Sequence, residues 1–158
     1  MDVTIRLAET KDLPRIQELS LKLSKKEHKE YDPLLDLDKI EKDDPKHYKN
    51  RIEKDDGCVF VAIIDGKIIG YICGGLAKKG SFGRLPNIIV TEIQTFFILE
   101  KYRSSGTGKK LYDKFLEWSK RKNADKIRLD VHPQNELAIK FYRKNNFKDY
   151  YLTLESDL

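Results

Sequence analysis

The sequence predicts a single mixed α/β domain, and three patterns along the chain indicate this class. Two apolar runs flank an Asp-Gly pair, the strongest short-range signal of a β-hairpin. Two later segments place apolar residues on one helical face, and each follows a run that reads as a strand. The 158 residues fit one domain, expected to span residues 1–158. The first half is thus built from hairpins and the second from strand–helix crossovers.

The chain is expected to open with a strand and a helix. Val3–Leu7 alternates apolar and polar residues, which is typical of a strand. Thr10 or Asp12 can then cap a helix whose apolar residues share one broad face. These residues are Leu13, Ile16, Leu19 and Leu23.

A long polar stretch follows this helix. We expect Lys25–Asp44 to form an extended connection with, at most, a short helical piece. Compact domains rarely keep long idle loops, so this stretch is a candidate binding loop. Pro45 then stands where a helix can start, and His47–Lys54 is predicted to continue it.

A β-hairpin is predicted around Asp65-Gly66. In a hairpin with this two-residue turn, residues whose numbers sum to 131 face each other. Cys58 and Cys73 meet this condition and would be opposite one another. A regular ladder holds opposed Cβ atoms about 4.5–5.5 Å apart, whereas a disulfide prefers about 3.8 Å. We therefore predict two reduced core thiols, in keeping with a cytoplasmic protein.

The second half is predicted to alternate strands with helices. Ile88–Leu99 reads as a long strand, and a helix starts at Gly108. Lys126–Val131 reads as a short strand, and Asn135–Lys144 as a second amphipathic helix. Phe147–Glu155 is expected to close the chain as a last strand.

The charge pattern narrows the function classes. With 31 basic and 26 acidic residues the net charge is +5, which suits a small anionic ligand. Basic residues alternate with acidic ones, which argues against a nucleic-acid binder. No apolar run approaches the roughly 20 residues of a membrane helix, and the start lacks a signal peptide's apolar stretch. We expect a cytoplasmic protein without nucleic-acid or membrane partners.

A glycine-bearing turn between a strand and a helix carries the clearest functional signal. Gly106 and Gly108 let the backbone turn sharply, and the amides of the first helical turn are free to bind an anion. Arg103, Lys109 and Lys110 add positive charge around them. The segment therefore predicts a phosphate or pyrophosphate site, although a glycine-rich connection without a ligand stays open.

Two common phosphate motifs do not fit this turn. A nucleoside-triphosphatase loop needs Ser or Thr after Gly108-Lys109 and a glycine where Arg103 stands. A dinucleotide-binding loop needs a third glycine after Gly106-x-Gly108, but Leu111 occupies that position. What remains is the pattern Arg-x-x-Gly-x-Gly.

A second segment runs from the end of a strand into a helix. Asn135 and Tyr142 lie seven residues apart, which places them two turns apart on one helix face. Asn135 also fits an ordinary N-cap, and Tyr142 also fits a core aromatic beside Phe141. Both interpretations stay open for each residue.

Together, the two segments resemble the GNAT superfamily of acetyl-CoA-dependent N-acetyltransferases. The resemblance rests on the RSSGTG turn and the later N-x-x-A-x-x-F-Y-x-K-x-x-F pattern, and it covers nearly the whole chain. It implies a twisted, mostly antiparallel sheet of six to seven strands flanked by about four helices. Ser104, Glu100 and Asn146 depart from the commonest residues of the family, and none of them removes a chemical group.

The resemblance assigns a cofactor site for acetyl-CoA and no metal. The pyrophosphate would lie on Arg103, Ser104, Ser105, Gly106, Thr107, Gly108 and Lys109, and the pantetheine arm would pair with Phe97, Ile98 and Leu99. Asn135 and Tyr142 match cofactor-contacting residues.

Roles in catalysis follow from the same resemblance. Tyr142 matches the tyrosine proposed to protonate the leaving thiolate, and its ordinary pKa near 10 is close to that of a thiol. Its hydroxyl can instead simply orient the sulfur. Glu92 resembles the general base, although a water chain can replace it, and strand alternation would put Glu92, Gln94 and Phe96 on one face. The Ile98 N–H can polarise the thioester carbonyl.

The acceptor amine is less defined. Tyr31, Asp32 and Glu92 are the predicted substrate-binding residues, since an acidic loop suits a cationic small molecule or a lysine side chain; a merely solvated loop fits equally. The three histidines show no metal-like spacing and are expected at the surface. We expect a monomer or homodimer, and the competing function is a non-catalytic acyl-CoA-binding regulatory module.

Overall fold

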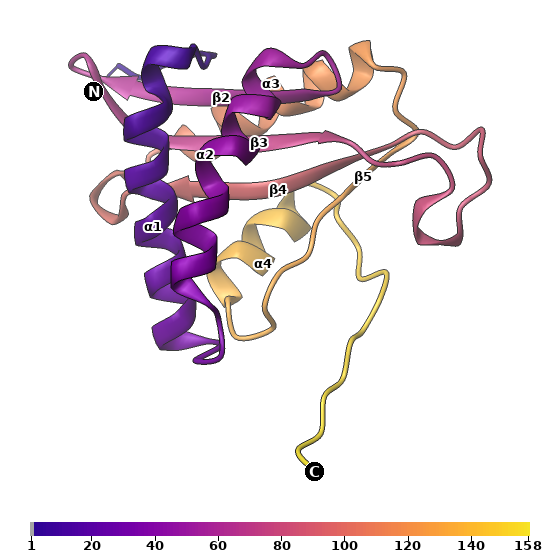
Figure 1. Ribbon diagram of the computed structural model, residues 1–158. Coiled ribbons are helices and arrows are strands. Elements are labelled where there is room, and N and C mark those ends of the chain that lie inside the picture. Colours follow the sequence, from indigo (N-terminus) through magenta and orange to yellow (C-terminus); the bar gives the residue numbers. More distant parts are fainter. Residues whose placement is uncertain (1) are drawn as a thin grey trace.

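The computed structural model describes residues 2–158 and places a five-stranded sheet between two layers of helices (Figure 1). The strands are β1 (Thr4–Leu7), β2 (Gly57–Ile64), β3 (Lys67–Leu76), β4 (Val90–Ile98) and β5 (Lys126–Arg128). The helices are α1 (Leu13–Glu30), α2 (Leu37–Glu53), α3 (Thr107–Arg121) and α4 (Glu136–Lys144). Short 3-10 turns cover Thr10–Asp12, Ser81–Gly83 and Glu100–Tyr102.

The sheet confirms the mixed α/β class and the mostly antiparallel order. The strands follow one another as β1-β2-β3-β4-β5, and only β4 and β5 are parallel. The strand count is five rather than six to seven, because the expected last strand, Phe147–Glu155, is not formed in the described chain. Within residues 2–158 no strand pairs with this segment, and a strand without a ladder partner leaves its backbone to water.

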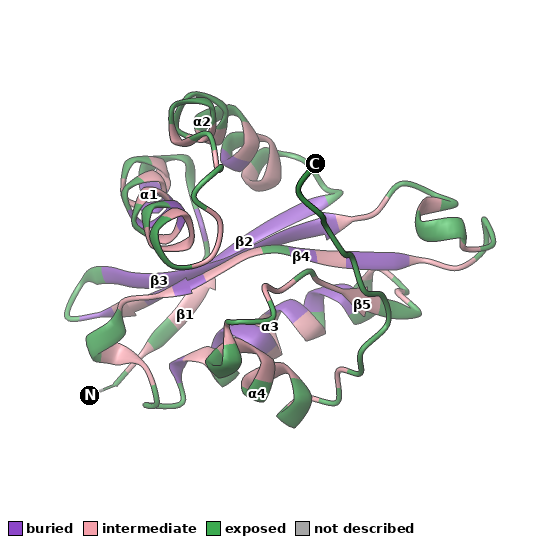
Figure 2. Ribbon diagram, turned by 90° about the horizontal axis from the view of Figure 1, so that it is seen from below, coloured by how far each residue is buried: buried purple, intermediate pink, exposed green. Residues whose placement is uncertain are grey.

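The two helical layers lie on opposite faces of the sheet, with α1 and α2 on one side and α3 and α4 on the other (Figure 2). Strands β2 and β3 are buried on both faces, as their continuous apolar sequences predict. The amphipathic helices seal these faces, with Ile16 and Leu19 of α1 on one side and Leu111 and Phe115 of α3 on the other. None of the described helices has the length and apolarity needed to cross a bilayer.

The predicted long connection Lys25–Asp44 is wrong, because most of it is helical. Helix α1 continues to Glu30, and α2 begins at Leu37 rather than at Pro45. The side chain of Asp36 accepts a hydrogen bond of 3.0 Å from the Lys39 amide, so Asp36 caps α2. Pro45 lies inside α2 on its exposed side, where water can satisfy the carbonyl that loses its partner.

The predicted opposition of the two cysteines is also wrong. Ile63 faces Ile68 as expected, but Ile69 is an extra residue in β3 and shifts the register beyond it. Cys58 therefore faces Gly74 instead of Cys73. The two thiols are free and buried in the cores on opposite faces of the sheet.

Candidate active site

The second half of β4 has a strand partner on one side only. β5 pairs with β4 over Val90–Glu92, whereas β3 accompanies β4 as far as Ile98. In Figure 1 the orange segment after β5 descends away from β4, and α4 lies below β4. Within residues 2–158, the other edge of β4 is therefore open from Ile93 to Ile98.

The hydrogen-bond pattern shows which backbone groups face this open edge. The Leu99 amide donates to the Ile69 carbonyl of β3 over 2.9 Å. Because backbone groups alternate sides along an antiparallel strand, the N–H and C=O of Ile98 point away from β3, toward the open edge. The same alternation turns Phe97 toward β3 and Phe96 toward the open edge. The N–H of Ile98 is thus available to a cofactor, whereas its carbonyl accepts a hydrogen bond from Arg103. The backbone of Phe96 also faces the open edge, which the sequence analysis missed. The amides of Phe97 and Leu99 face β3 instead.

The open edge leads directly into the glycine-bearing turn. Ser104 and Gly106 adopt left-handed backbone conformations, with φ of 58° and 82°, and α3 starts at Thr107. The Ser105 hydroxyl donates to the Tyr102 carbonyl over 2.7 Å and lies 2.9 Å from the Thr107 hydroxyl. These contacts hold the turn in shape while the first amides of α3 stay without helical partners.

The charges around the turn favour an anion. The Nε of Arg103 donates to the Ile98 carbonyl over 2.9 Å, and within the described chain its guanidinium has no acidic partner. Lys109 is paired with Asp113 of α3, and Lys110 is exposed. Free amides, an uncompensated guanidinium and an exposed turn suit a pyrophosphate, so these residues fit the acidic end of CoA.

Helix α4 presents Asn135 and Tyr142 as the spacing predicts, one at its start and one near its end. The side-chain Oδ1 of Asn135 accepts a hydrogen bond of 3.2 Å from the Ala138 amide, so Asn135 is an N-cap. Its side-chain NH2 has no partner among the described residues and remains free to donate.

Tyr142 is largely buried against Phe141 and Phe147. Burial raises the pKa of its phenol well above the ordinary value, so the match to a thiol is poorer than the sequence suggested. The hydroxyl has no hydrogen-bond partner in residues 2–158. Every fully buried side-chain oxygen in these residues has a hydrogen-bond partner. The Tyr142 hydroxyl has none, so it must be accessible to solvent.

Glu92 and Phe96 do not share a face, contrary to the sequence expectation. Gln94 is an extra residue in β4, and this bulge reverses the alternation. Thr91 bonds a serine of α3, which puts Glu92 on the opposite face, and Gln94 accepts from Arg51 of α2 over 2.9 Å. Phe96 instead packs on a phenylalanine of α4. Glu92 is half-buried, and its carboxylate has no ion pair among the described residues.

The sequence analysis missed a contact between Tyr31 and His132. The rings of Tyr31 and His132 stack, with centroids 4.9 Å apart and planes 14° apart. This contact joins the turn after α1 to the loop after β5. Glu27, one helical turn before Tyr31, is half-buried, and burial raises the pKa of its carboxyl against an opposing effect of His132. His132 is therefore not a simple surface residue.

The acidic loop residues are partly structural. Asp32 accepts a hydrogen bond of 3.0 Å from the Leu34 amide, and Asp36 caps α2. Only part of the predicted negative surface is thus free to meet a cation.

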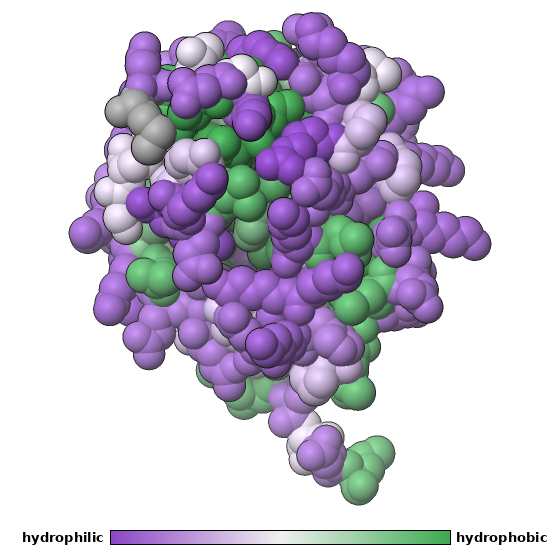
Figure 3. Space-filling model, turned by 90° about the vertical axis from the view of Figure 1, so that its left-hand side faces the viewer, coloured by the Kyte–Doolittle hydropathy of each residue, from purple (hydrophilic) through white to green (hydrophobic). Residues whose placement is uncertain are grey.

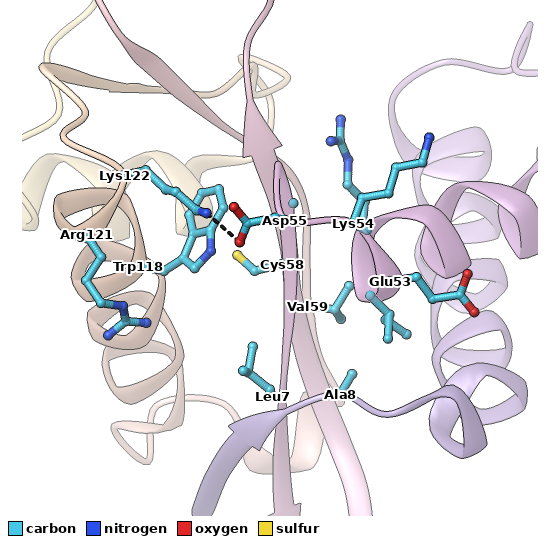
Figure 4. A pocket seen from close by; sticks show the side chains of 13 residues that line it. Leu7, Ala8, Glu53, Lys54, Asp55, Cys58, Val59, Trp118, Arg121 and Lys122 are labelled. Carbon is cyan, nitrogen blue, oxygen red and sulfur yellow. Dashed lines mark ion pairs between the residues drawn. The ribbon is translucent and has the colours of Figure 1, made fainter.

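A separate groove of about 500 Å³ lies between α2 and α3, at the end of β2 remote from the turn (Figure 4). Leu7, Cys58 and Trp118 line it. Its Lys122 is paired with Asp55 over 2.7 Å, whereas Lys54 and Arg121, which also line it, have no ion pair among the described residues.

A family model described as acetyltransferase (GNAT) family matches residues 21–147, and the chain therefore belongs to that family. Among sequence relatives, an uncharacterised N-acetyltransferase of Archaeoglobus fulgidus is 32% identical over 119 residues, covering 75% of this chain and 79% of the relative. An N-alpha-acetyltransferase of Saccharolobus solfataricus is 34% identical over 92 residues, covering 56% and 55%. The chain is accordingly an acyltransferase.

Solved structures share the fold at low sequence identity. A tetramutant of the BH1408 protein from Bacillus halodurans superposes with a TM-score of 0.80 at 21% identity, covering 98% of this chain and 99% of that one. The enzyme AAC(6')-Iy in complex with a CoA bisubstrate analogue gives 0.76 at 18% identity, with coverages of 100% and 99%.

Proposed function

We propose that the enzyme transfers an acetyl group from acetyl-CoA to a primary amine by direct attack in a ternary complex. One observation carries this proposal. The open edge of β4 at Ile98 leads into the anion-binding turn before α3. Arg103, in that turn, donates a hydrogen bond to the Ile98 carbonyl. An extended pantetheine arm that ends in a pyrophosphate needs these two features side by side.

The cofactor would use both parts of this arrangement. Its pyrophosphate would lie on the turn, at Arg103, Ser104, Ser105, Gly106, Thr107, Gly108 and Lys109. Its pantetheine amides would pair with the backbone of Phe96, its thioester carbonyl would face the Ile98 N–H, and the free NH2 of Asn135 can donate to it.

The reaction forms one bond and breaks one. The neutral amine attacks the thioester carbonyl, so a C–N bond forms and the C–S bond breaks. The Ile98 N–H would stabilise the oxyanion, and Glu92, or a water chain, would take the proton from the ammonium. The unpaired Tyr142 hydroxyl would donate to the departing thiolate. Burial keeps this phenol protonated and makes it a weaker acid, so a hydrogen bond to the thiolate is favoured over complete proton transfer.

Glu92 and Tyr142 would reach the open edge of β4 from opposite faces of the sheet. The open edge of β4 allows this, because no strand in residues 2–158 closes it beyond Glu92. The half-buried Glu27, beside Tyr31 and His132, is a second carboxylate for an incoming ammonium.

For the acceptor we place the α-amine of a peptide first. Sequence relatives named N-alpha-acetyltransferases support this choice, although the chain spans only 63% and 55% of their lengths. The aminoglycoside enzyme is similar in fold alone. Asp32 would serve less well than Glu92, because its carboxylate is used by the Leu34 amide.

Release of free CoA thiol tests the function. Wild-type protein is mixed with acetyl-CoA and, in turn, a peptide with a free α-amine, its N-terminally blocked lysine-containing counterpart, a polyamine and an aminoglycoside. Amine-dependent thiol release with the free α-amine peptide is the expected result. Binding of acetyl-CoA without thiol release on any amine would instead indicate a regulatory module.

A further inference from the structure

A chain of hydroxyl groups runs through the core from β4 to the surface between α1 and α2. Tyr48 of α2 lies at its centre, with its phenolic oxygen 3.0 Å from the Ser20 hydroxyl of α1 and 3.3 Å from the Thr95 hydroxyl of β4. Ser20 in turn bonds the carboxylate of Asp44, and the Tyr71 hydroxyl lies 2.9 Å from that of Tyr48 as a side branch. Tyr48, Ser20 and Tyr71 are at most 2% exposed.

The hydrogen bonds of this chain all point the same way. An ionised carboxylate only accepts hydrogen bonds, and a hydroxyl has one proton to donate. Ser20 therefore donates to Asp44, and Tyr48 must donate to Ser20. Because the proton of Tyr48 is then used, Thr95 is the donor to Tyr48. Donation thus runs without a break from Thr95 through Tyr48 and Ser20 to Asp44.

Both ends of this route are half-buried, although its middle is sealed. Thr95 lies on the α1–α2 face of the sheet, as Glu92 does, and stands between Glu92 and Ile98 along β4. Asp44 lines a cavity of about 240 Å³ between α1 and α2. The side of the molecule that includes α1 carries mostly hydrophilic side chains (Figure 3). A proton that reaches Asp44 can therefore pass to water.

The proposed transfer to an amine releases one proton that must leave this face. At pH 7 an α-amine is mostly protonated, since its ordinary pKa is about 7.7–8.0. Tyr142 would serve the thiolate from the α3–α4 side of the sheet, so the amine would approach on the α1–α2 side, where Thr95 lies (Figure 2). The Thr95 oxygen can accept a proton there while its own moves on to Tyr48.

We propose that Thr95, Tyr48 and Ser20 form a proton relay that delivers the proton of the acceptor ammonium to Asp44. The relay rests on the transfer proposed above, because it acts on the same amine. The N–H bond of the ammonium breaks as an O–H bond forms on Thr95. The hydroxyl proton of Thr95 moves to Tyr48, that of Tyr48 to Ser20, and that of Ser20 to the Asp44 carboxylate. Each hydroxyl ends as it began, and the products are a neutral amine and a protonated Asp44.

Two variants interrupt the relay at different points. Asp44→Asn keeps an acceptor for the Ser20 hydrogen bond but cannot take a proton, and Tyr48→Phe removes the central hydroxyl. Single-turnover release of CoA thiol is measured at pH 7 with a peptide that carries a free α-amine. Each variant is expected to slow this step at least about tenfold, because a positioned base contributes roughly 10²–10⁴-fold. The affinity for CoA should stay unchanged in calorimetry.

Each variant has a matched control. Tyr71→Phe removes a hydroxyl from the same buried cluster but off the route, so it should transfer at close to the wild-type rate. Asp38→Asn removes an exposed carboxylate of the same helix as Asp44 and should also behave as wild type. Asp44 lies at the surface end of the route, so Asp44→Asn tests the relay even if Tyr48→Phe folds poorly.

A second acceptor separates proton transfer from a loss of packing. A peptide with an aminooxy group in place of its α-amine is neutral at pH 7 and depends less on a base, so the losses in Asp44→Asn and Tyr48→Phe should shrink on it. Equal losses on both acceptors, a wild-type rate in Asp44→Asn, or a Tyr71→Phe variant as slow as Tyr48→Phe would overturn the relay. Wild-type protein that releases no thiol with any amine would contradict the proposed function, and the relay with it.

Discussion

The Nε of Arg103 donates a hydrogen bond of 2.9 Å to the carbonyl oxygen of Ile98, which ties the open edge of β4 to the anion-binding turn. Lysine would have to make both contacts from one compact ammonium, because it lacks the planar fork of arginine. Arg103→Lys should therefore raise the Kd for CoA about tenfold, equal to about 1.4 kcal/mol, in titration calorimetry. Arg121→Lys, at the far end of α3, is the matched control and should leave the Kd unchanged.

Ser104 has a left-handed backbone, with φ of 58°, at a position where a side chain is strained. Ser104→Gly should remove that strain and stabilise the protein by about 0.5–1 kcal/mol after the entropy cost of glycine. The melting temperature should then rise by about 1–4 °C.

The neighbouring Ser105 provides the contrast. Its hydroxyl bonds the Tyr102 carbonyl over 2.7 Å, so Ser105→Gly should destabilise the protein by about 1 kcal/mol. Equal shifts in both variants would contradict the assignment of strain to Ser104.

Tyr48 is buried in a network of hydroxyls, 2.9 Å from Tyr71 and 3.0 Å from Ser20. Burial, opposed by these hydrogen bonds, raises its pKa from 10.0 to about 12. A raised pKa means that the unfolded phenol ionises first. The stability from this residue is therefore complete below pH 10 and is lost between pH 10 and pH 12, by about 1.4 kcal/mol per pH unit.

Denaturant unfolding at a series of pH values measures this loss. Tyr48→Phe should flatten the alkaline decline and lower stability at neutral pH by about 1–3 kcal/mol, because the Tyr71 hydroxyl loses its partner. The exposed Tyr151→Phe should change neither. An unchanged alkaline slope in Tyr48→Phe would contradict the raised pKa.

Tyr142 is expected to act on the leaving group and not on binding. Tyr142→Phe keeps the packing ring and removes the hydroxyl, so the CoA affinity should stay within a few-fold of wild type. A loss of roughly 100-fold in single-turnover rate would match a general acid, about 3 kcal/mol of barrier. A loss of only a few-fold would mean that the hydroxyl merely orients the sulfur, and an unchanged rate would remove Tyr142 from the mechanism.

Features set by neighbouring residues could be predicted from the sequence. The hairpin at Asp65-Gly66 formed because those two residues tolerate the positive φ that the turn needs. The anion-binding turn was likewise readable, since its glycines, its arginine and the helix start lie within a few positions. The capping role of Asn135 is local for the same reason.

Features that depend on contacts between residues far apart in the sequence could not be predicted from it. The extra residues Ile69 and Gln94 depend on how adjacent strands pair, and they moved Cys58 and Glu92 away from their expected neighbours. Glu27 and His132 are over a hundred positions apart and meet only in the folded chain. The strand predicted at the C-terminus has no strand partner among residues 2–158, which no local pattern reveals.

Binding of acetyl-CoA to the α3 turn is the central claim, and calorimetry on two variants at Gly108 tests it most directly. An added Cβ at Gly108 would lie 3.4 Å from the Phe141 ring and 3.5 Å from Ile98, so small side chains can fold here. Gly108→Asp adds a negative charge at the helix start, and Gly108→Asn has the same shape without that charge. We predict a weakened CoA affinity in both, with the aspartate at least about tenfold weaker than the asparagine at low salt. A folded Gly108→Asp variant that binds CoA as tightly as wild type would contradict the account.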